Sequence, residues 1–267
     1  AGAKYDEAKN ARLPFRRYRL GPVGSGLAIL CCLVPLAFGF LFPLWRLGSW
    51  ALSTYEKILD WTFFKLILHS LSLAAISALV IVSAATFLAF VGRYFKNPSI
   101  QASNRLAILG YSVPGAVVAM AVLIVSGQIN LSLGVILTGS LVTLVFAYLV
   151  RFLAVAWQPI DSGMDKNCAH LNEASQSLKS TPLVSLLKVN LPLLRPSLFA
   201  AGLLVFIDIM KELPLTLILR PFNFETLSTR TYDLTSQAQI AESSVPALCI
   251  ILMVILPVVW LNRKMEA

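Results

Sequence analysis

Two carboxylates that could meet a cation, Asp208 and Glu212, follow a strongly apolar run, with Lys211 beside them. Side chains four residues apart share one face of a helix. A charge at the centre of a membrane helix costs roughly 2.5–3.5 kcal/mol on insertion scales, so such residues are functional candidates. We therefore expect Asp208, Lys211 and Glu212 to border a substrate path. The alternative is a helix-end charge cluster, paired with Lys211 or with another helix.

No lasting metal site is predicted. His69 and His170 have no carboxylate or cysteine partner at ligand spacing, and both are expected to be structural. The four cysteines also lack metal-ligand spacing and are expected to be small packing residues: Cys31, Cys32, Cys168 and Cys249. A transport path for an ion should bind it weakly, because a tight site would trap it.

A second candidate is the polar, amphipathic stretch from Asn167 to Leu198. Its apolar residues recur every three or four positions, which predicts short helices with one apolar face. They are Leu171, Ala174, Leu178, Leu183, Leu186 and Leu187. Such a face with polar flanks suits docking into a groove of another protein. The alternative is an interfacial amphipathic helix without a partner.

The composition places both candidates in a membrane protein. Hydrophobic residues make up 57% of the chain and charged residues only 13%, against about 25% charged residues in soluble domains. The net charge of +9 comes from basic residues beside apolar stretches, which the positive-inside rule explains better than nucleic-acid binding does.

Six apolar stretches are long enough, or nearly so, to cross a bilayer as helices. They are 27–47, 66–91, 106–126, 131–150, 197–213 and 246–261. We therefore predict an all-α membrane protein with six transmembrane helices. Proline and glycine interrupt several spans, either beside a pathway or as ordinary kinks: Pro35, Pro43, Pro114, Gly115, Gly134 and Gly139.

The distribution of Lys and Arg predicts the orientation. With the N-terminus in the cytoplasm, sixteen of them fall inside, Arg151 among them, and six outside. Residues 1–26 then form a cytoplasmic lead-in, 27–261 the membrane domain, about 156–196 a cytoplasmic loop, and 262–267 a cytoplasmic tail. The outer segment 214–245 is expected to be a short re-entrant or surface helix, or else a solvated loop.

The cytoplasmic loop resembles the coupling loop of ABC-transporter permeases. That pattern reads Glu-Ala-Ala, three residues, Gly, nine residues, then Ile-x-Leu-Pro. Here Glu173-Ala174-Ser175 begins it, Lys179 stands at the glycine position, and Val189-Asn190-Leu191-Pro192 closes it. Ser175 and Lys179 depart from the pattern. Thr181-Pro182 could supply the turn that the glycine would have allowed, because proline disfavours helix in the residue before it.

A second stretch, 210–227, contains Lys-Glu-Leu-Pro and Arg-Pro-Phe-Asn and is similar to iron(III)-type permeases, which are related to the thiamine, sulfate and molybdate group. Together the two resemblances cover residues 60–261. They imply the type I (MetI-like) ABC importer permease fold, and ferric iron as the substrate. The lead-in 18–21 resembles the junction between the two halves of a fused permease, so a second permease half or subunit is expected.

The resemblance also implies partners and a location. An ABC ATPase dimer would bind the loop at Leu171, Glu173, Ala174, Ser175, Leu178, Lys179, Val189, Leu191 and Pro192. The sequence has no G-x-x-x-x-G-K-[ST] phosphate loop, so no cofactor is expected on this chain, and ATP and Mg²⁺ belong to the partner ATPase. A periplasmic or extracellular binding protein would deliver substrate at the bacterial inner membrane.

Two other functions remain open. Within the same family, the substrate could be thiamine or an oxyanion. In a different class, the chain could be a secondary transporter driven by an ion gradient, which would need intramembrane ion ligands in discontinuous helices. A purely structural membrane protein is disfavoured by the organised cytoplasmic loop.

Overall fold

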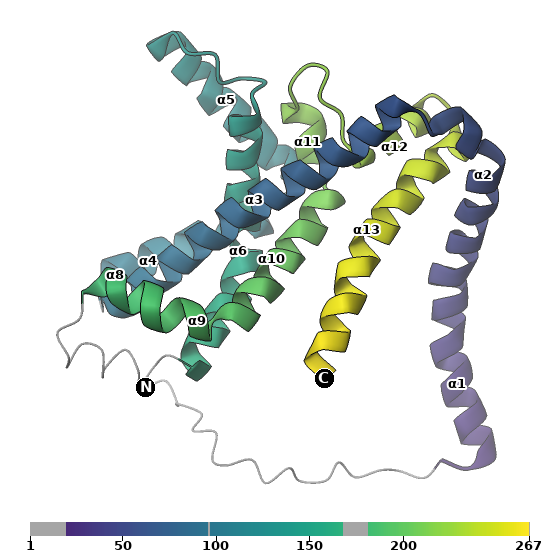
Figure 1. Ribbon diagram of the computed structural model, residues 1–267, viewed down its shortest axis with the longest axis horizontal. Coiled ribbons are helices and arrows are strands. Elements are labelled where there is room, and N and C mark those ends of the chain that lie inside the picture. Colours follow the sequence, from purple (N-terminus) through teal and green to yellow (C-terminus); the bar gives the residue numbers. More distant parts are fainter. Residues whose placement is uncertain (1–19, 96, 168–180, 267) are drawn as a thin grey trace. The chain divides into compact units, whose positions relative to one another are not determined.

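Helices form every regular element of residues 20–95, 97–167 and 181–266, which are the residues described in this computed structural model (Figure 1). Five helices in this part of the chain are long and apolar enough to cross a membrane. A sixth span arises if the pair Pro182–Leu193 and Arg195–Met210, bent by 78°, counts as one. The prediction of an all-α membrane architecture is confirmed.

The chain divides into two units, residues 1–46 and 47–267. The first contains α1 (Pro22–Leu36), a π-helical turn η1 (Ala37–Leu41) and the start of α2 (Phe42–Ile58), and no residue of α1 or η1 is buried. The π-turn lies between Pro35 and Pro43, each of which lacks the N–H that a regular α-helix would use.

The second unit is built around three helices that pack together: α3 (Trp61–Tyr94), α6 (Leu141–Asn167) and α10 (Arg195–Met210). Small residues allow their backbones to approach closely. Those that are completely or almost completely buried are Ala74, Ala85, Ala89, Ala147, Ala156 and Ala201. Asp60 caps α3 by accepting a hydrogen bond of 2.6 Å from the Phe63 N–H.

Shorter elements close the two ends of this unit (Figure 1). At one end lie α4 (Pro98–Ala107) and an arm made of α8 (Pro182–Val184), the π-turn η3 (Ser185–Asn190) and α9 (Leu191–Leu193). The 3₁₀ turn η2 (Ile108–Ser112) follows α4 and packs along α6. At the other end lie α11 (Pro214–Leu219) and α12 (Leu227–Ser236). The remaining helices are α5 (Gly115–Leu133), which contacts α11, and α13 (Ile240–Glu266), which contacts α12.

The third and fourth spans were predicted too early in the chain, at 106–126 and 131–150. The structure has α5 at 115–133 and α6 at 141–167. Pro114 separates η2 from α5, and Gly134 ends α5 in the left-handed conformation with φ of 67°. The third span was predicted to begin at 106 because residues 106–109 are apolar. The fourth was predicted to end just before Arg151 because this residue is charged, although it lies inside α6.

The segment 214–245 is folded and partly buried. It contains α11, α12 and the first turns of α13, and Leu215, Leu219 and Leu227 are almost completely buried. The Thr226 hydroxyl caps α12 by accepting from the Thr229 N–H, and the Thr229 hydroxyl accepts from the Thr226 N–H. The segment was predicted to be one short re-entrant or surface helix, or else a solvated loop; the structure has two short helices there, and both bury residues in the core.

Candidate functional site

Helix α10 has a buried stripe of residues flanked by two faces that differ in chemistry. Ala201, Val205 and Ile209 are buried in the core. At 3.6 residues per turn, Leu204 and Asp208 project from one side of that stripe, and residues 199, 203 and 206 project from the opposite side. One side is therefore polar near its end, while the other presents only apolar groups.

The polar side of α10 borders a groove of about 480 Å³ shared with α6 and η2. Its polar groups come from all three elements: Tyr111 from η2, Gln158 and Ser162 from α6, and Asp208 from α10. Gln158 and Ser162 are one helical turn apart and exposed. In contact with hydrocarbon, an exposed amide would lose its hydrogen-bonding partners, so this side suits contact with water or with another polar surface.

Asp208 belongs to this polar groove and also pairs locally. Its Oδ1 lies 2.8 Å from Nζ of Lys211, with the Asp208 side chain 14% exposed and the Lys211 side chain 63% exposed. The two residues thus stand together as expected, in the helix-end pairing that was the alternative to a cation path.

Glu212 points to a different partner. Its Oε2 lies 3.6 Å from Nε of Arg151 in α6, and Oε1 accepts a hydrogen bond of 3.3 Å from the Leu215 N–H. Gly115, at the start of α5, leaves room for this pair, because a Cβ there would lie 2.7 Å from Glu212 Oε1 and closer still to Arg151 Nη1. Glu212 is 8% exposed, so it joins helices and does not line the Asp208 groove.

Arg151 was not expected at this place. The sequence analysis counted it among the cytoplasmic basic residues, but the structure places it inside α6, with its side chain 19% exposed. The signal that could have found it is the charge pattern, because an arginine within an otherwise apolar stretch is expected to face the bundle interior and to pair with a carboxylate or other polar group. Arg151, Gln158 and Ser162 were all missed because the fourth span was predicted to end at residue 150, whereas α6 continues to Asn167.

A set of hydrogen bonds extends from Glu212 into the elements at this end. The Glu212 carbonyl accepts from the hydroxyls of Thr216 at 2.8 Å and Ser228 at 3.0 Å. Thr216 shares a second hydrogen bond of 2.6 Å with the buried Tyr148 hydroxyl, and the Leu227 N–H donates to Ser70 Oγ at 2.8 Å. These bonds fix α11 and α12 against α3, α6 and α10.

A polar pocket of about 430 Å³ opens beside the first turns of α3. The cations Lys57, Lys65 and Arg230 line it, together with two acids, Asp60 and Glu225. His69 also lines it and stacks on Phe224, with ring centroids 4.9 Å apart. This histidine therefore has a packing role, and its polar edge borders a pocket with mixed charge.

At the opposite end, one arginine joins two core helices. The Arg93 guanidinium near the end of α3 binds Asp161 at 2.7 Å and also Asp165, one turn further along α6. The buried Asn104 of α4 donates to the Leu88 carbonyl at 3.0 Å. The end of α6, from which the predicted coupling loop departs, is thus held to α3.

The predicted cytoplasmic loop, 156–196, begins too early, because residues 156–167 are the last turns of α6. After the residues that the structure does not describe, the chain continues as the arm formed by α8, η3 and α9. Six of the loop's predicted contact residues lie outside the described residues: Leu171, Glu173, Ala174, Ser175, Leu178 and Lys179. The other three lie on the arm, where Val189 and Leu191 are half-buried and Pro192 is exposed. Asn190 between them is fully buried and donates to the Ser185 carbonyl at 3.3 Å.

The arm leads directly into α10, at the 78° bend. Thr181, before Pro182, has the extended conformation expected ahead of a proline.

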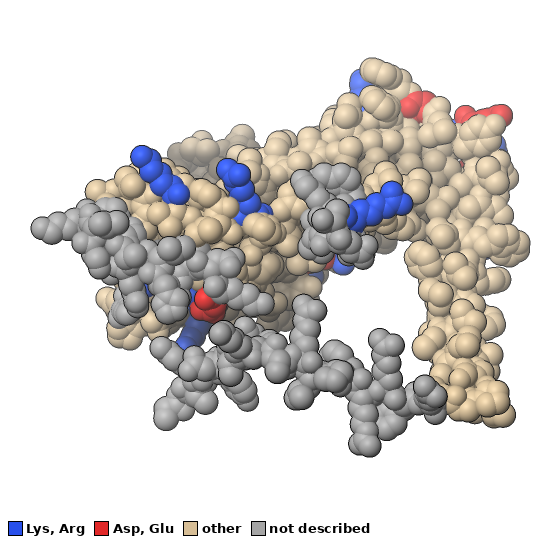
Figure 2. All heavy atoms as spheres, turned by 60° about the horizontal axis from the view of Figure 1, so that its bottom comes forward, with Lys and Arg blue, Asp and Glu red and all other residues tan. Residues whose placement is uncertain are grey.

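Basic side chains stand out against the mostly uncharged surface in Figure 2, which brings the lower end of Figure 1 toward the viewer. Arg105 of α4, Lys188 of η3 and Arg195 of α10 are exposed. Within 20–95, 97–167 and 181–266, no three His, Cys, Asp or Glu side chains could jointly hold a metal ion.

Curated proteins with sequence similarity to the chain include two kinds of transport permease. The "Fe(3+)-transport system permease protein FbpB 2" of Haemophilus influenzae is 27% identical over 195 residues, which are 73% of this chain and 38% of that protein. The "Putative 2-aminoethylphosphonate transport system permease protein PhnV" of Salmonella typhimurium is 23% identical over 256 residues, which are 94% of this chain and 95% of that protein. The chain thus spans well under half the length of the first relative and nearly all of the second.

Solved structures share the fold. A chain of a bacterial alginate ABC transporter in complex with an alginate-bound periplasmic protein superposes with a TM-score of 0.71 at 14% identity, covering 90% of this chain and 93% of that chain. A chain of a bacterial ABC transporter that imports alginate gives a TM-score of 0.70 at 12% identity, with 91% and 94% coverage. No family model matches the sequence.

Proposed function

We propose, on the premise that this chain belongs with the permease subunits of ABC importers, that it forms half of a substrate path through a bacterial inner membrane. The observation that carries this proposal is the polar groove between α6 and α10. It brings Tyr111, Gln158, Ser162 and Asp208 together on one side of α10, whereas the opposite side of α10 borders a groove lined mostly by apolar residues. Polar groups at membrane depth are costly unless they face water or a polar partner. A second permease half or subunit would close the path on this side.

Energy would enter through the arm. An ABC ATPase dimer, which would hold ATP and Mg²⁺, would contact the loop that includes Glu173 and ends at Pro192. Because the arm continues into α10 without an intervening loop, motion of the arm would change the position of Leu204 and Asp208 in the groove. ATP-driven closure would favour one of two pre-existing pore states, as in any population shift.

The proposed orientation follows from the charge count. The end with α4 and the arm would face the cytoplasm, as would both termini. The end with α11 and α12 would then face outward and receive substrate from a periplasmic or extracellular binding protein. The hydrogen bonds around Glu212 would give that protein a rigid docking surface.

Ferric iron is the proposed substrate, supported by the sequence likeness to the Haemophilus permease and by the Asp208 carboxylate in the groove. Such an ion would meet oxygen ligands that bind it weakly enough for release. A second candidate is a small phosphonate, supported by the Salmonella relative and by the three cations of the pocket beside α3. An ion-gradient mechanism is less favoured, since Asp208 is the only carboxylate lining the described groove.

Reconstitution tests the proposal. Full-length protein with its ATPase and binding protein would be placed in liposomes, and uptake of radioactive iron and of 2-aminoethylphosphonate would be measured with and without ATP. We expect ATP-dependent uptake of iron, reduced about tenfold or more by Asp208→Asn together with Gln158→Leu, while the matched variant Arg105→Gln retains it. Uptake driven by a proton or sodium gradient without ATP would contradict the proposed class. ATP-driven uptake of the phosphonate alone would contradict only the substrate.

A further inference from the structure

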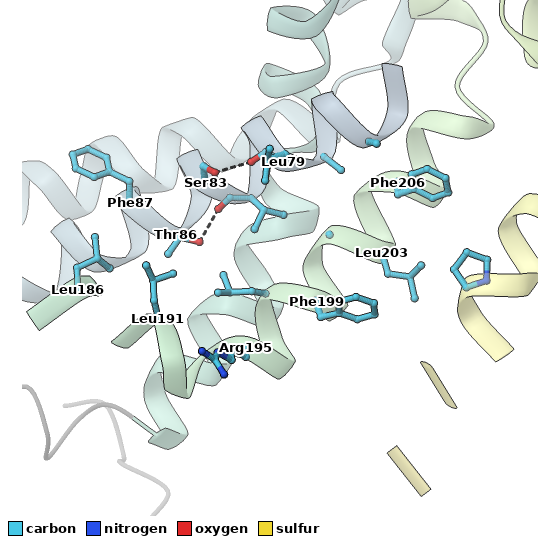
Figure 3. A pocket seen from close by; sticks show the side chains of 16 residues that line it. Leu79, Ser83, Thr86, Phe87, Leu186, Leu191, Arg195, Phe199, Leu203 and Phe206 are labelled. Carbon is cyan, nitrogen blue, oxygen red and sulfur yellow. Dashed lines mark hydrogen bonds between the residues drawn. The ribbon is translucent and has the colours of Figure 1, made fainter. Parts of the chain in front are cut away.

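An apolar groove of about 870 Å³ follows the side of α10 opposite the polar groove. Figure 3 shows its walls: Leu79, Ser83 and Phe87 from α3 on one side, and Phe199, Leu203 and Phe206 from α10 on the other. Leu186 and Leu191 of the arm close one end, and Pro257 of α13 borders it. The groove therefore lies away from the residues of the proposed substrate path.

The groove offers almost nothing to a polar ligand. The Ser83 hydroxyl donates to the Leu79 carbonyl at 2.7 Å, and the Thr86 hydroxyl donates to the Val82 carbonyl at 2.6 Å. Both donors are thus used within α3, as the dashed lines in Figure 3 show. A solute that needs hydrogen bonds would lose them here, whereas hydrocarbon would lose none.

The exception is Arg195, at the end of the groove where α9 meets α10 (Figure 3). This side chain is exposed and forms no ion pair with any residue that the structure describes. It is also the first residue of α10, where the helix dipole favours an anion.

We infer that this groove binds an anionic phospholipid, with its acyl chains along α3 and α10 and its phosphate at Arg195. A long apolar channel with a cation at one end matches an amphiphile with an anionic head. Basic pockets between transmembrane helices recognise such head groups by the same combination. A packed helix of a second subunit would also fill the apolar walls, but it would need a carboxylate of its own at the Arg195 end, whereas an anionic phospholipid carries the negative charge in its head group. The inference rests only on the membrane location within the proposed function.

Gly202 provides a direct test, because it lines the groove and a Cβ there would meet only Val82 Cγ2, at 3.9 Å. Gly202→Leu would thus fill the groove without a clash at Cβ. Ser83→Phe fills it from α3 and serves as the second variant if the first fails to fold. Arg195→Gln removes the cation, and Arg105→Gln removes an exposed cation of α4, outside the groove, as the matched control.

The full-length protein in detergent would be mixed with equal amounts of phosphatidylglycerol and phosphatidylcholine, and bound lipids would be counted by native mass spectrometry. We expect phosphatidylglycerol to be preferred about fivefold, as one basic contact near the surface predicts. Arg195→Gln should abolish that preference, the groove-filling variants should reduce binding of both lipids, and Arg105→Gln should change nothing. Equal binding of the two lipids by the unaltered protein, or a preference that survives Arg195→Gln, would overturn the inference. This assay needs no transport, so it can fail or succeed independently of the substrate path.

Discussion

Arg151 of α6 and Glu212, which follows α10, form an ion pair with Nε and Oε2 3.6 Å apart, next to the glycine that begins α5. Three core elements therefore meet at one pair of opposite charges. Both side chains are largely removed from solvent, at 19% and 9% exposure, so each charge depends on the other for its stability in this position.

We expect Arg151→Met to lower the free energy of unfolding by about 3 kcal/mol, because it leaves the Glu212 carboxylate buried without a counter-charge. Glu212→Gln should have a similar but smaller effect, since the amide can still accept from the Leu215 N–H. The measurement is unfolding in mixed micelles followed by circular dichroism. The double variant Arg151→Met, Glu212→Met should recover part of the loss, and strictly additive losses would contradict the pairing.

Close backbone approach at Gly110 gives a second prediction. A Cβ at this position would lie 2.9 Å from the carbonyl carbon of Val150 and closer still to its oxygen, and backbone atoms cannot move aside as a side chain can. Gly110→Ala should therefore destabilise the fold by about 1–3 kcal/mol. Gly127→Ala is the matched control: no atom lies within 4 Å of a Cβ there, and alanine favours the α5 helix by about 1 kcal/mol. Equal effects of the two changes would exclude the close contact.

The contact between Arg93 and its two aspartates gives a prediction about coupling. Arg93→Gln removes the charge that holds Asp161 and Asp165 near the end of α6. We expect transport in the reconstituted system to fall several-fold while the partner ATPase continues to hydrolyse ATP, because the loop after α6 would no longer move together with α3. The control is Arg105→Gln, which removes an exposed cation from α4. A parallel loss of transport and ATP hydrolysis would indicate a general folding defect instead.

The sequence was sufficient for the helical fold because apolar length determines what can span a bilayer. It was sufficient for the proximity of Asp208 and Lys211 because helix geometry fixes neighbours three residues apart. The prediction from the sequence failed at Arg151. A hydropathy average counts an arginine against a membrane span and contains no information about the Glu212 carboxylate that pairs with it. That pairing joins residues 61 positions apart in the chain, and only the tertiary fold brings them together.

The two sides of α10 show the same limit. Ser197–Met210 reads as one nearly uniform apolar run, and nothing in it indicates that Leu204 and Phe206 border different grooves. The difference comes from the neighbours: α6 and η2 supply Gln158 and Tyr111 on one side, whereas α3 supplies apolar residues on the other. Asp208 could therefore be named as a candidate from the sequence, whereas Gln158 and Ser162 could not.

The buried hydrogen bond between Tyr148 and Thr216 supports a last prediction. The two hydroxyl oxygens are 2.6 Å apart, and Thr216 also donates to the Glu212 carbonyl at 2.8 Å. With that donor occupied, Tyr148 must donate to Thr216. Thr216→Val should therefore cost about 1–3 kcal/mol, because it leaves the buried Tyr148 donor without a partner and removes one of the two hydroxyls that donate to the Glu212 carbonyl. Tyr148→Phe should cost less, about 1 kcal/mol, because the Thr216 hydroxyl keeps its bond to Glu212. Unfolding in micelles would measure both, and a larger loss from Tyr148→Phe than from Thr216→Val would contradict this donor order.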